Sequence, residues 1–313
     1  MNTLTHSELI LSSPLPLDQN PSRVYIASLP ADTGKRSQWQ ALRVIAQVLD
    51  TDPDTLNWSA LRYQHTAAIR SRLAAEYAPA TVNKILSALR QTLEQAWLLG
   101  QMDVDDYMRA IKLDPVTGDT LPAGRELSTA EIRALIFTCK ADANTQAGTR
   151  DAAIIALMYT TGMRRDEVVS LSLASYDPET GQVSVTGKRN SQRIVYIING
   201  AAEALADWLR VRGADNGALF SQINKTGRIS SMESLSPYAI YKMLAKRALQ
   251  AGIKKFSPHD LRRTFVSHLL DSGADIATVA KIAGHKNVRT TQRYDRRPEE
   301  AKKKAASLLH VPY

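Results

Sequence analysis

Apolar residues recur at helical spacing through the first third of this chain. One run ends at Asp52-Pro53 and has its apolar face at Trp39, Leu42, Ile45 and Leu49. A longer run ends at Gly100 and has its apolar face at Val82, Ile85, Leu86, Leu89, Leu93 and Trp97. The pattern predicts a small all-helical domain over residues 22–113.

Two stretches without apolar periodicity mark the edges of that domain. Residues 1–21 are rich in Ser, Pro and Asn, which predicts a mobile leader. Residues 114–126 contain two Pro and two Gly and are interpreted as a linker. The rest of the chain, residues 127–313, then forms a second domain that ends in a charged segment and an apolar tail.

The second domain mixes helical and strand patterns. It opens with Ser128 and Glu131 at the spacing of a capping box. A buried helix is predicted around Ala152–Tyr159, followed by a pair of strands at Val183–Thr186 and Arg193–Ile197. We therefore expect a mainly α chain with a small antiparallel β-sheet, divided into a helical domain and a mixed α+β domain.

Composition narrows the class of partner. A length of 313 residues suits two domains, and a formal charge of +9 with a pI near 9.6 favours an anionic partner, most commonly DNA. Charge alone also leaves open the alternative that this is a basic protein with no polyanion partner. Cys139 is the only cysteine, which excludes an internal disulfide and fits a reducing compartment. No apolar run could span a bilayer and no secretory signal is visible, so we expect a cytoplasmic protein, associated with the nucleoid when bound to DNA.

Six residues of the second domain have side chains suited to phosphodiester chemistry: Arg164, Lys188, His259, Arg262, His285 and Tyr294. Two arginines can clamp the non-bridging oxygens of a phosphate, and a lysine can give a proton to a leaving oxygen. Two histidines can shuttle protons or donate hydrogen bonds, and a tyrosine can attack phosphorus. Such a set could cut a nucleic-acid backbone through a covalent phosphotyrosine, without a metal ion or a cofactor.

Most of these residues, taken alone, have a plainer interpretation. Arg164 and Glu167 could form a capping or surface ion pair, although Glu167 could equally orient Arg164 on a phosphate. Lys188 at the tip of a hairpin would be solvated, and His285 would cap the end of a helix. Tyr294 in a basic stretch would be a surface aromatic residue.

The string Ser257–Phe265 is the most specific in the chain. On a helix, His259 and Arg262 share one face, while apolar residues pack the opposite side. A helix that begins here points backbone N–H groups outward, which favours a bound phosphate. His259 can then shuttle a proton while Arg262 clamps the same phosphate. Arg263 is interpreted as a phosphate-backbone or salt-bridge residue, and His268 as a packing residue.

These strings, in this order and at these separations, closely resemble those of the tyrosine recombinase (phage integrase) family. The segments that carry the resemblance are Thr161–Glu167, His259–Arg262, Gly284-His285 and Thr290–Tyr294. The first departs from the family pattern only in having Met163 where the family has Leu. The resemblance covers about residues 127–300, and it implies that the six residues above are catalytic and that Glu167 supports them.

The resemblance also implies a mechanism. Tyr294 attacks a DNA phosphate to leave a 3′-phosphotyrosine and a free 5′ hydroxyl, Lys188 protonates the leaving oxygen, and His285 reaches the scissile phosphate. The two domains form a C-shaped clamp on duplex DNA, with residues 22–113 as the core-binding domain. A hydroxyl of a partner strand attacks the phosphotyrosine, so neither ATP nor a divalent metal is needed. Two rounds of exchange pass through a four-way junction in a homotetramer, in which residues 299–313 dock on a neighbouring protomer.

Further DNA contacts are expected from basic residues outside the catalytic set. The candidates are Arg90, Arg189, Arg193, Lys242, Lys246 and Arg263. Such contacts are mostly to phosphates, so they predict a steep dependence of affinity on salt but no target sequence. Accessory DNA-bending or directionality proteins are possible further partners.

Several biological roles use the same residues. Only about 20 residues precede the helical domain, so we expect no arm-binding domain and favour the integrase of a mobile genetic element acting at simple core sites. Xer-type or transposon resolution stays open. Two alternatives of another class are a type IB topoisomerase-like enzyme, which relaxes DNA without exchange between two sites, and a non-catalytic DNA-binding protein. The complete set of six residues argues against the non-catalytic protein.

Overall fold

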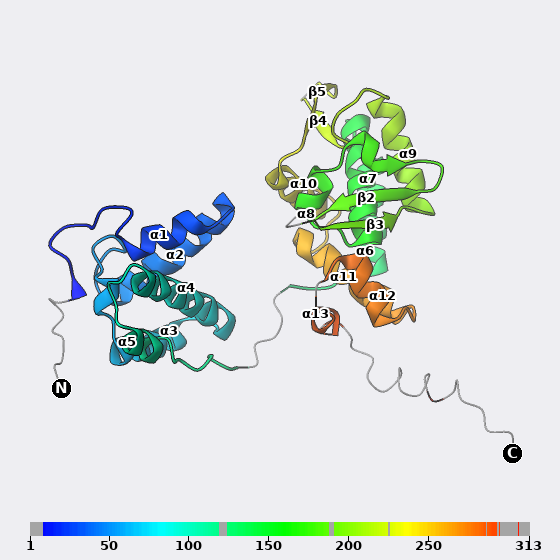
Figure 1. Ribbon diagram of the computed structural model, residues 1–313. Helices are drawn as coiled ribbons and strands as arrows, with labels where there is room; N and C mark the ends of the chain where they lie inside the picture. Colours follow the sequence, from blue (N-terminus) through cyan, green and yellow to red (C-terminus); the bar gives the residue numbers. More distant parts are fainter. Residues whose placement is uncertain are drawn as a thin grey trace, which may run out of the picture. The chain divides into compact units, whose positions relative to one another are not determined.

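The computed structural model describes residues 9–118, 124–187, 191–224, 226–285, 287–292, 294 and 306. The chain divides into two compact units, Met1–Pro122 and Ala123–Tyr313 (Figure 1). The first unit is helical, and the second combines helices with two small antiparallel sheets, which confirms the predicted fold class. None of the helices in the described parts combines the length and the apolar character that a membrane crossing requires.

The first unit is built from helices that close over one core. They are α1 (Pro21–Ser28), α2 (Asp32–Val48), the 3-10 helix η2 (Trp58–Ala60), α3 (Tyr63–Glu76), α4 (Pro79–Leu98) and α5 (Val104–Ala110). Leu42 and Ile45 of α2 are fully buried, as are Leu86 and Leu89 of α4. The apolar faces that the helical spacing predicts therefore meet, and each such side chain contributes about 1.5–3 kcal/mol by leaving water.

The prediction of a mobile leader over residues 1–21 is wrong for the part that the structure describes. Leu9 is buried in the helical core, and the Leu11 N–H donates to the Thr55 carbonyl at 2.8 Å. The Asn20 side chain caps α1 by accepting from the Ser22 N–H at 3.0 Å. Burial of an apolar side chain and a helix cap outweigh the Ser- and Pro-rich composition here. Residues 1–8 lie outside the described part.

The predicted linker over residues 114–126 is anchored at both described ends. Val116 and Asn83 exchange two hydrogen bonds of 2.9 Å within the first unit. In the second unit, the Arg125 N–H donates to Asp260 at 2.9 Å, and Glu126 accepts from Ser267 at 2.7 Å. Only residues 119–123 lie outside the described part. Composition alone cannot detect such anchors, because the partners lie far away in the sequence.

The second unit places helices around α7 (Thr145–Thr161), near the centre of this unit in Figure 1. The other helices are α6 (Thr129–Lys140), α8 (Arg165–Val169), α9 (Gly200–Arg212), α10 (Pro237–Gln250), α11 (Pro258–Asp271), α12 (Ile276–Ala283), α13 (Arg289–Gln292) and the 3-10 helix η3 (Leu173–Ser175). Ser128 and Glu131 form the predicted capping box of α6. Helix α7 is longer than the sequence predicted, and α9 was missed.

A three-stranded antiparallel sheet has the order β1 (Tyr176–Asp177), β2 (Gln182–Thr186), β3 (Gln192–Tyr196). The two predicted strands correspond to β2 and β3 and are confirmed. Val183 pairs with Val195 and Val185 with Arg193, and the three valines are buried. The second sheet, β4 (Ser221–Ile223) with β5 (Ile229–Ser234), was missed because its serines conceal any alternation of apolar and polar residues.

A close approach between α7 and α11 depends on Gly162. This residue ends α7 with a positive φ of 62°, which favours glycine. A Cβ atom at this position would lie 2.3 Å from a ring carbon of Phe265 on α11. The glycine therefore lets α11 pack against the end of α7, just where Arg164 follows in the chain.

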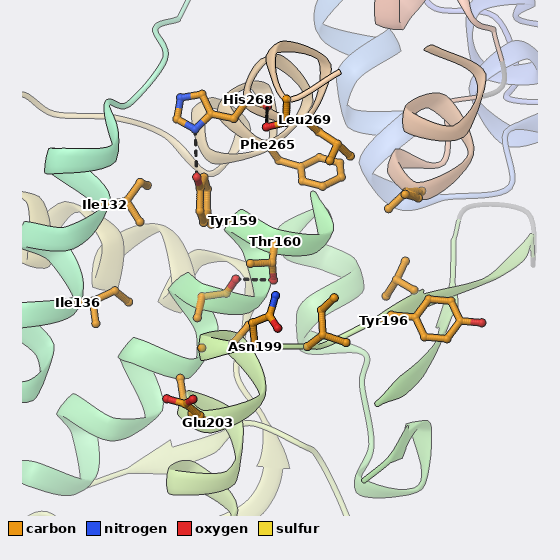
Figure 2. A pocket seen from close by; sticks show the side chains of 18 of the residues that line it. Ile132, Ile136, Tyr159, Thr160, Tyr196, Asn199, Glu203, Phe265, His268 and Leu269 are labelled. Carbon is orange, nitrogen blue, oxygen red and sulfur yellow. Dashed lines mark hydrogen bonds between the residues drawn. The ribbon is translucent and has the colours of Figure 1, made fainter. Parts of the chain in front are cut away.

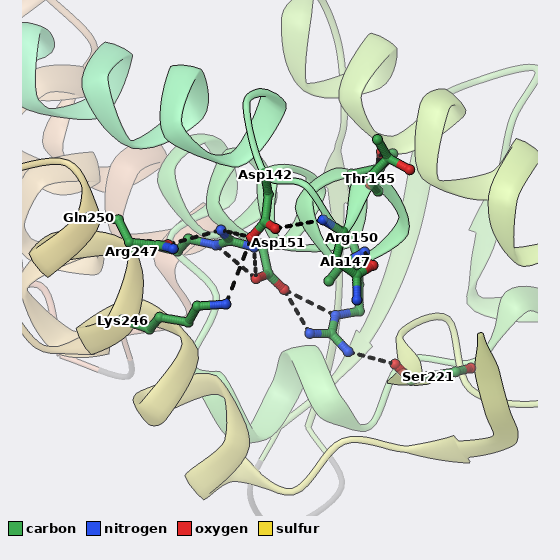
Figure 3. Close-up of polar contacts among 11 residues, drawn as sticks. Asp142, Thr145, Ala147, Arg150, Asp151, Ser221, Lys246, Arg247 and Gln250 are labelled. Atoms are coloured by element: carbon green, nitrogen blue, oxygen red, sulfur yellow. Dashed lines mark hydrogen bonds and ion pairs between the residues drawn. The ribbon is translucent and has the colours of Figure 1, made fainter. Parts of the chain in front are cut away.

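A buried charge network fastens α10 to α7 (Figure 3). Arg247 is fully buried and donates to Asp151 from Nε at 2.9 Å and from Nη2 at 2.7 Å, and it also pairs with Asp142. Arg150 donates to the other oxygen of Asp151 and, at 3.1 Å, to the Ser221 carbonyl. The two buried guanidinium groups thus face two carboxylates and balance them in charge, while the exposed Lys246 ammonium lies 3.7 Å from Asp142 at the edge of the network.

A cavity of about 920 Å³ is lined by residues of α6, α7, α9, α11 and α12 and by the end of β3 (Figure 2). Its lining includes the apolar side chains of Ile132, Ile136 and Phe265. On one side of it the Tyr159 hydroxyl meets His268 Nδ1 at 3.0 Å, with the two rings edge to face. The predicted packing role of His268 is confirmed.

Candidate active site

Helix α11 presents His259 and Arg262 near its N-terminus. Ser257 and Asp260 cap the helix reciprocally, and Pro258 occupies its first turn. Arg262 is only 3% exposed, and its Nη1 donates to the Gly162 carbonyl at 2.7 Å. Its buried Nη2 has no hydrogen-bond partner among the described residues. Burial and the neighbouring charge of Arg164 lower the pKa of Arg262 to about 10, so the folded site disfavours this cation unless an anion joins it.

Arg164 is fixed by Glu167. The Glu167 carboxylate accepts from the Arg164 backbone N–H at 2.9 Å and from its Nη1 at 2.8 Å. Burial alone would raise the pKa of Glu167, which is 4% exposed, but hydrogen bonds from Arg193 and Arg164 outweigh burial and lower this pKa. Glu167 is therefore ionised at neutral pH, and the predicted contact between it and Arg164 is present.

Arg193, predicted as a DNA contact, instead points inward from β3. Its Nη1 and Nη2 donate to the two Glu167 oxygens at 3.1 and 2.8 Å, and its Nε donates to the Ile282 carbonyl at 2.9 Å. Only 14% of its side chain is exposed. Because the guanidinium is held inside by a buried carboxylate, this geometry argues against a surface contact with DNA.

His285 follows the left-handed Gly284 (φ 68°) that ends α12. Arg164 Nη2 donates to the Gly284 carbonyl at 3.4 Å, and His285 Nδ1 lies 2.8 Å from the Thr291 hydroxyl. Burial and the charges of Arg262 and Arg164 lower the pKa of His285 to about 4. The sequence allowed a cationic imidazole at this helix end, but in the fold burial and the arginines outweigh the helix dipole, and His285 is neutral at pH 7.

Tyr294 lies beside both histidines. Its hydroxyl is 3.5 Å from His259 Nε2, at the outer limit of hydrogen bonding, and its ring stacks on that of His285 with centroids 6.4 Å apart. The Arg263 guanidinium carbon lies 5.4 Å from the Tyr294 ring centroid. Desolvation and the charges of Arg262 and Arg263 lower the pKa of His259. Because part of the side chain remains accessible to solvent, screening reduces this effect. A neutral His259 can accept a proton from the phenol.

A cavity of about 340 Å³ opens at this cluster. Its lining includes Arg164, His259 and Arg262, which the sequence predicted, and Tyr241, which the sequence analysis did not single out. The lining also includes Arg165 and Asp166, which pair with each other at 3.9 Å. Arg164, Arg262 and the imidazole then make a site for an anion with several oxygens. No group of three or more metal-binding side chains occurs among the described residues.

Lys188 and Arg189 lie outside the described residues. The residues on either side are described: the Gly187 N–H donates to the Ser191 carbonyl at 2.7 Å and closes the base of the hairpin. A Cβ at Gly187 would lie 3.6 Å from a Glu167 oxygen, so the base of this hairpin lies beside the site.

The remaining DNA-contact candidates differ in exposure. Lys242 and Lys246 lie exposed on α10, with Lys246 3.7 Å from Asp142. Arg90 donates to the Leu113 carbonyl at 2.6 Å, and Arg263 is only 6% exposed. Of these four, Lys242 and Lys246 are therefore the better placed to meet a phosphate backbone.

Two residues that support the site were not predicted to do so from the sequence. Thr291 binds His285, and Arg193 binds Glu167. Thr291 belongs to the Thr290–Tyr294 string, so its position was a usable signal. Arg193 gave no such signal, because a basic residue on a short strand is compatible with either an outward or an inward side chain.

Comparison with known proteins gives consistent matches. The profile of the phage integrase family matches residues 125–300, more than half of the chain. Tyrosine recombinase XerC of Erythrobacter litoralis is 33% identical over 224 residues, which cover 70% of this chain and 69% of that protein. Tyrosine recombinase XerD of Lacticaseibacillus casei is 34% identical over 229 residues, which cover 69% and 72%.

Two solved structures have a similar fold at low sequence identity. The Tn1549 transposon integrase, in complex with circular intermediate DNA, is 14% identical with a TM-score of 0.68, over 94% of this chain and all of the other. XerH site-specific recombinase, bound to a palindromic difH substrate, is 18% identical with a TM-score of 0.65, over 98% of each chain. At these identities the structural likeness supports the fold alone.

Proposed function

Because the chain belongs to the phage integrase family of tyrosine recombinases, and is therefore a site-specific DNA recombinase that cleaves and rejoins strands, we propose that Tyr294 is its nucleophile. The Oη–P bond forms as the bond from phosphorus to the 5′ oxygen breaks. This leaves a 3′-phosphotyrosine and a free 5′ hydroxyl. The phenol proton passes to His259, which is 3.5 Å away.

The observation that carries the proposal is the buried guanidinium of Arg262. Within the described residues its Nη2 is unpartnered, and it lines a cavity with Arg164 and His259, beside Tyr294. A buried, unpaired donor costs free energy in the empty protein. A phosphate oxygen would remove that cost, and it would do so most strongly when negative charge builds at phosphorus in the transition state.

The other roles follow from the same geometry and from the family resemblance. Arg164, oriented by Glu167, clamps a second phosphate oxygen, and neutral His285 donates a hydrogen bond. Lys188 is proposed as the general acid that protonates the 5′ oxygen. Its support is the family pattern together with the closed hairpin base at Gly187. The reaction as proposed uses neither ATP nor a divalent metal.

We propose duplex DNA with a specific recombination site as the substrate, bound by both units, with residues 22–113 as core-binding domain. Lys242 and Lys246 contact phosphates. Recombination on paired sites requires a homotetramer, and residues 299–313, of which only residue 306 is described, dock on a neighbouring protomer. The protein acts in the cytoplasm on nucleoid DNA, and accessory DNA-bending or directionality proteins remain candidates.

Two biological roles are candidates. Integration of a mobile element is the role favoured by the sequence analysis, and the fold is shared with a transposon integrase. Xer-type resolution is the second candidate, because curated relatives at 30–39% identity are named XerC or XerD. The DNA to which the protein becomes attached in cells distinguishes the two roles.

The test is to trap the protein on DNA with detergent in cells, digest it, and identify the peptide that carries a nucleotide adduct. We expect the adduct on Tyr294, with Tyr294→Phe retaining DNA binding but giving no adduct. Tyr196→Phe, at an exposed position, is the matched control. An adduct on another residue, or none in a DNA-bound wild type, would overturn the proposal. Strand exchange between two sites separates a recombinase from an enzyme that only relaxes DNA.

A further inference from the structure

We propose that Arg193 is a positioning residue for strand cleavage, which holds Arg164 through Glu167 and holds the His285 segment through the end of α12. The proposal rests on the proposed function, because Arg164 and His285 are the groups that it places on the phosphate. In Figure 1 the elements involved, β3, α8 and α12, are separate parts of the second unit. Arg193 lies on β3 and contacts α8 through Glu167 and α12 through the Ile282 carbonyl.

The first arm of Arg193 completes the hydrogen bonding of Glu167. Each Glu167 oxygen accepts two hydrogen bonds, one from Arg164 and one from Arg193. Four donors around one buried carboxylate leave it a single orientation. Without Arg193, Glu167 would keep only the Arg164 contacts. Its carboxylate could then rotate, and the Arg164 guanidinium would rotate with it.

The second arm of Arg193 fixes the end of α12. Its Nε donates to the Ile282 carbonyl at 2.9 Å, two residues before Gly284 and three before His285. A Cβ at Gly284 would lie 3.1 Å from the Arg193 guanidinium carbon, so the backbone of Gly284 packs directly on the guanidinium. This contact gives a reason, besides the positive φ, for a glycine at this position.

A direct phosphate contact by Arg193 is the competing interpretation, and the geometry argues against it. To reach DNA, the guanidinium would have to leave Glu167 and the Ile282 carbonyl. That movement would leave the carboxylate of Glu167, which is 4% exposed, with Arg164 as its remaining cation among the contacts described. Losing one partner of a buried ion pair is costly, because it leaves an uncompensated charge.

The two interpretations predict different measurements. A positioning residue changes the rate of phosphotyrosine formation at saturating protein, but neither the DNA affinity nor its salt dependence. A misplacement of about 1 Å is expected to slow that step about 100-fold. A phosphate contact, by contrast, weakens binding and lowers the slope of log affinity against log salt by about 1.

The experiment measures single-turnover cleavage and DNA affinity for full-length wild type, Arg193→Lys, Arg193→Ala, Glu167→Gln and the double variant Arg193→Ala with Glu167→Gln. Arg193→Lys keeps the positive charge but loses the planar guanidinium that makes these paired hydrogen bonds, and Arg193→Ala loses both. We therefore expect both variants to cleave about 100-fold more slowly at unchanged DNA affinity. The double variant should lose less than the product of the two single losses, because the contact between Arg193 and Glu167 is shared while the contact with the Ile282 carbonyl is not. Arg210→Ala, at an exposed ion pair with Asp207, is the control with unchanged rate.

Other outcomes overturn the inference. A reduced salt slope with an unchanged saturated rate makes Arg193 a DNA contact. Additive losses, or a rate that falls only in step with the fraction of folded protein in thermal unfolding, make its role general stabilisation. If wild type forms the Tyr294 adduct and the Arg193 variants cleave normally, this inference fails while the proposed function stands. If the adduct lies on another residue, the proposed function fails, and the same rates measured at that residue decide the role of Arg193.

Discussion

The second unit contains two clusters in which arginine side chains surround buried carboxylates, and these clusters differ in charge balance. In the first, Arg247 and Arg150 face Asp142 and Asp151, and the four side chains are at most 13% exposed. In the second, the guanidinium groups of Arg164, Arg193 and Arg262 gather around a single carboxylate, that of Glu167. The four groups named for the first cluster sum to zero charge, with only the exposed Lys246 added beside Asp142, whereas the second has an excess of two positive charges, counted as three arginines against one glutamate.

This difference separates a cluster that holds the fold together from one prepared for a ligand. Arg247 has carboxylate partners for Nε and for both terminal nitrogens, whereas Arg262 has a carbonyl on one side and, among the described residues, no partner for Nη2. Burial lowers the pKa of Arg262 to about 10, but for Arg247 the two carboxylates outweigh burial and raise the pKa. Separating a buried cation from its counter-ions destabilises the folded chain, whereas a buried cation that lacks counter-ions favours binding of an anion.

The largest expected effect comes from breaking the neutral cluster. Arg247→Met should lower the free energy of unfolding by about 3–5 kcal/mol, because it leaves Asp142 and Asp151 buried with too few cations. Denaturant unfolding of wild type and variant measures this loss. Arg210→Met, which removes an exposed ion pair with Asp207, is the control and should change stability by less than about 1 kcal/mol. Similar losses in the two variants would contradict the comparison.

Breaking the unbalanced cluster should affect cleavage and spare stability. Arg262→Met should slow phosphotyrosine formation by about 10²–10³-fold, because one donor to the developing phosphate charge is lost. Its free energy of unfolding should stay within about 1 kcal/mol of wild type, because the variant also removes a buried and poorly paired charge. A stability loss as large as that of Arg247→Met would show that both clusters are structural.

An added anion should stabilise only the unbalanced cluster. Sulfate at about ten times its dissociation constant should raise the free energy of unfolding by about 1.4 kcal/mol. Sulfate also stabilises proteins generally, so the same titration on Arg262→Met measures that background. The difference between wild type and Arg262→Met is the specific part. Equal stabilisation of the two proteins would rule out an anion site at Arg262.

The smallest effect concerns pH. The folded-state pKa of His285 is about 4, below its ordinary value of 6.5, so the folded protein binds fewer protons than the unfolded chain between these values. The contribution of His285 to the free energy of unfolding is fully present above pH 6.5 and is lost as the pH falls toward 4. The full shift would correspond to about 2 kcal/mol between pH 7 and pH 5; after screening by solvent around this partly exposed ring, wild type should lose roughly 1 kcal/mol more than His285→Asn in denaturant unfolding. An equal loss would mean that burial and the arginines do not lower the pKa of His285.

Local patterns predicted well what local chemistry controls. The helix faces of α2 and α4, the capping box of α6 and the β2–β3 pair depend on neighbours within a few residues, or on one short turn. The ordered part of the leader and the inward orientation of Arg193 were not predicted, for the opposite reason. Leu9 is buried by a core made of distant helices, and Arg193 turns inward because Glu167, 26 residues earlier, reaches its strand. The catalytic role of Lys188 stays a prediction, since it lies outside the described residues.

The sequence by itself determined which chemical groups this protein has and in what order: two arginines, a lysine, two histidines and a tyrosine, in strings that resemble one family. Tertiary structure decided how those groups behave. Arg262 contacts a carbonyl 100 residues away, and the Tyr294 hydroxyl meets a histidine 35 residues away. Burial, charge balance and the low pKa of His285 arise from such distant contacts, because electrostatic interactions depend on distance and solvent exposure in space and not on separation along the chain.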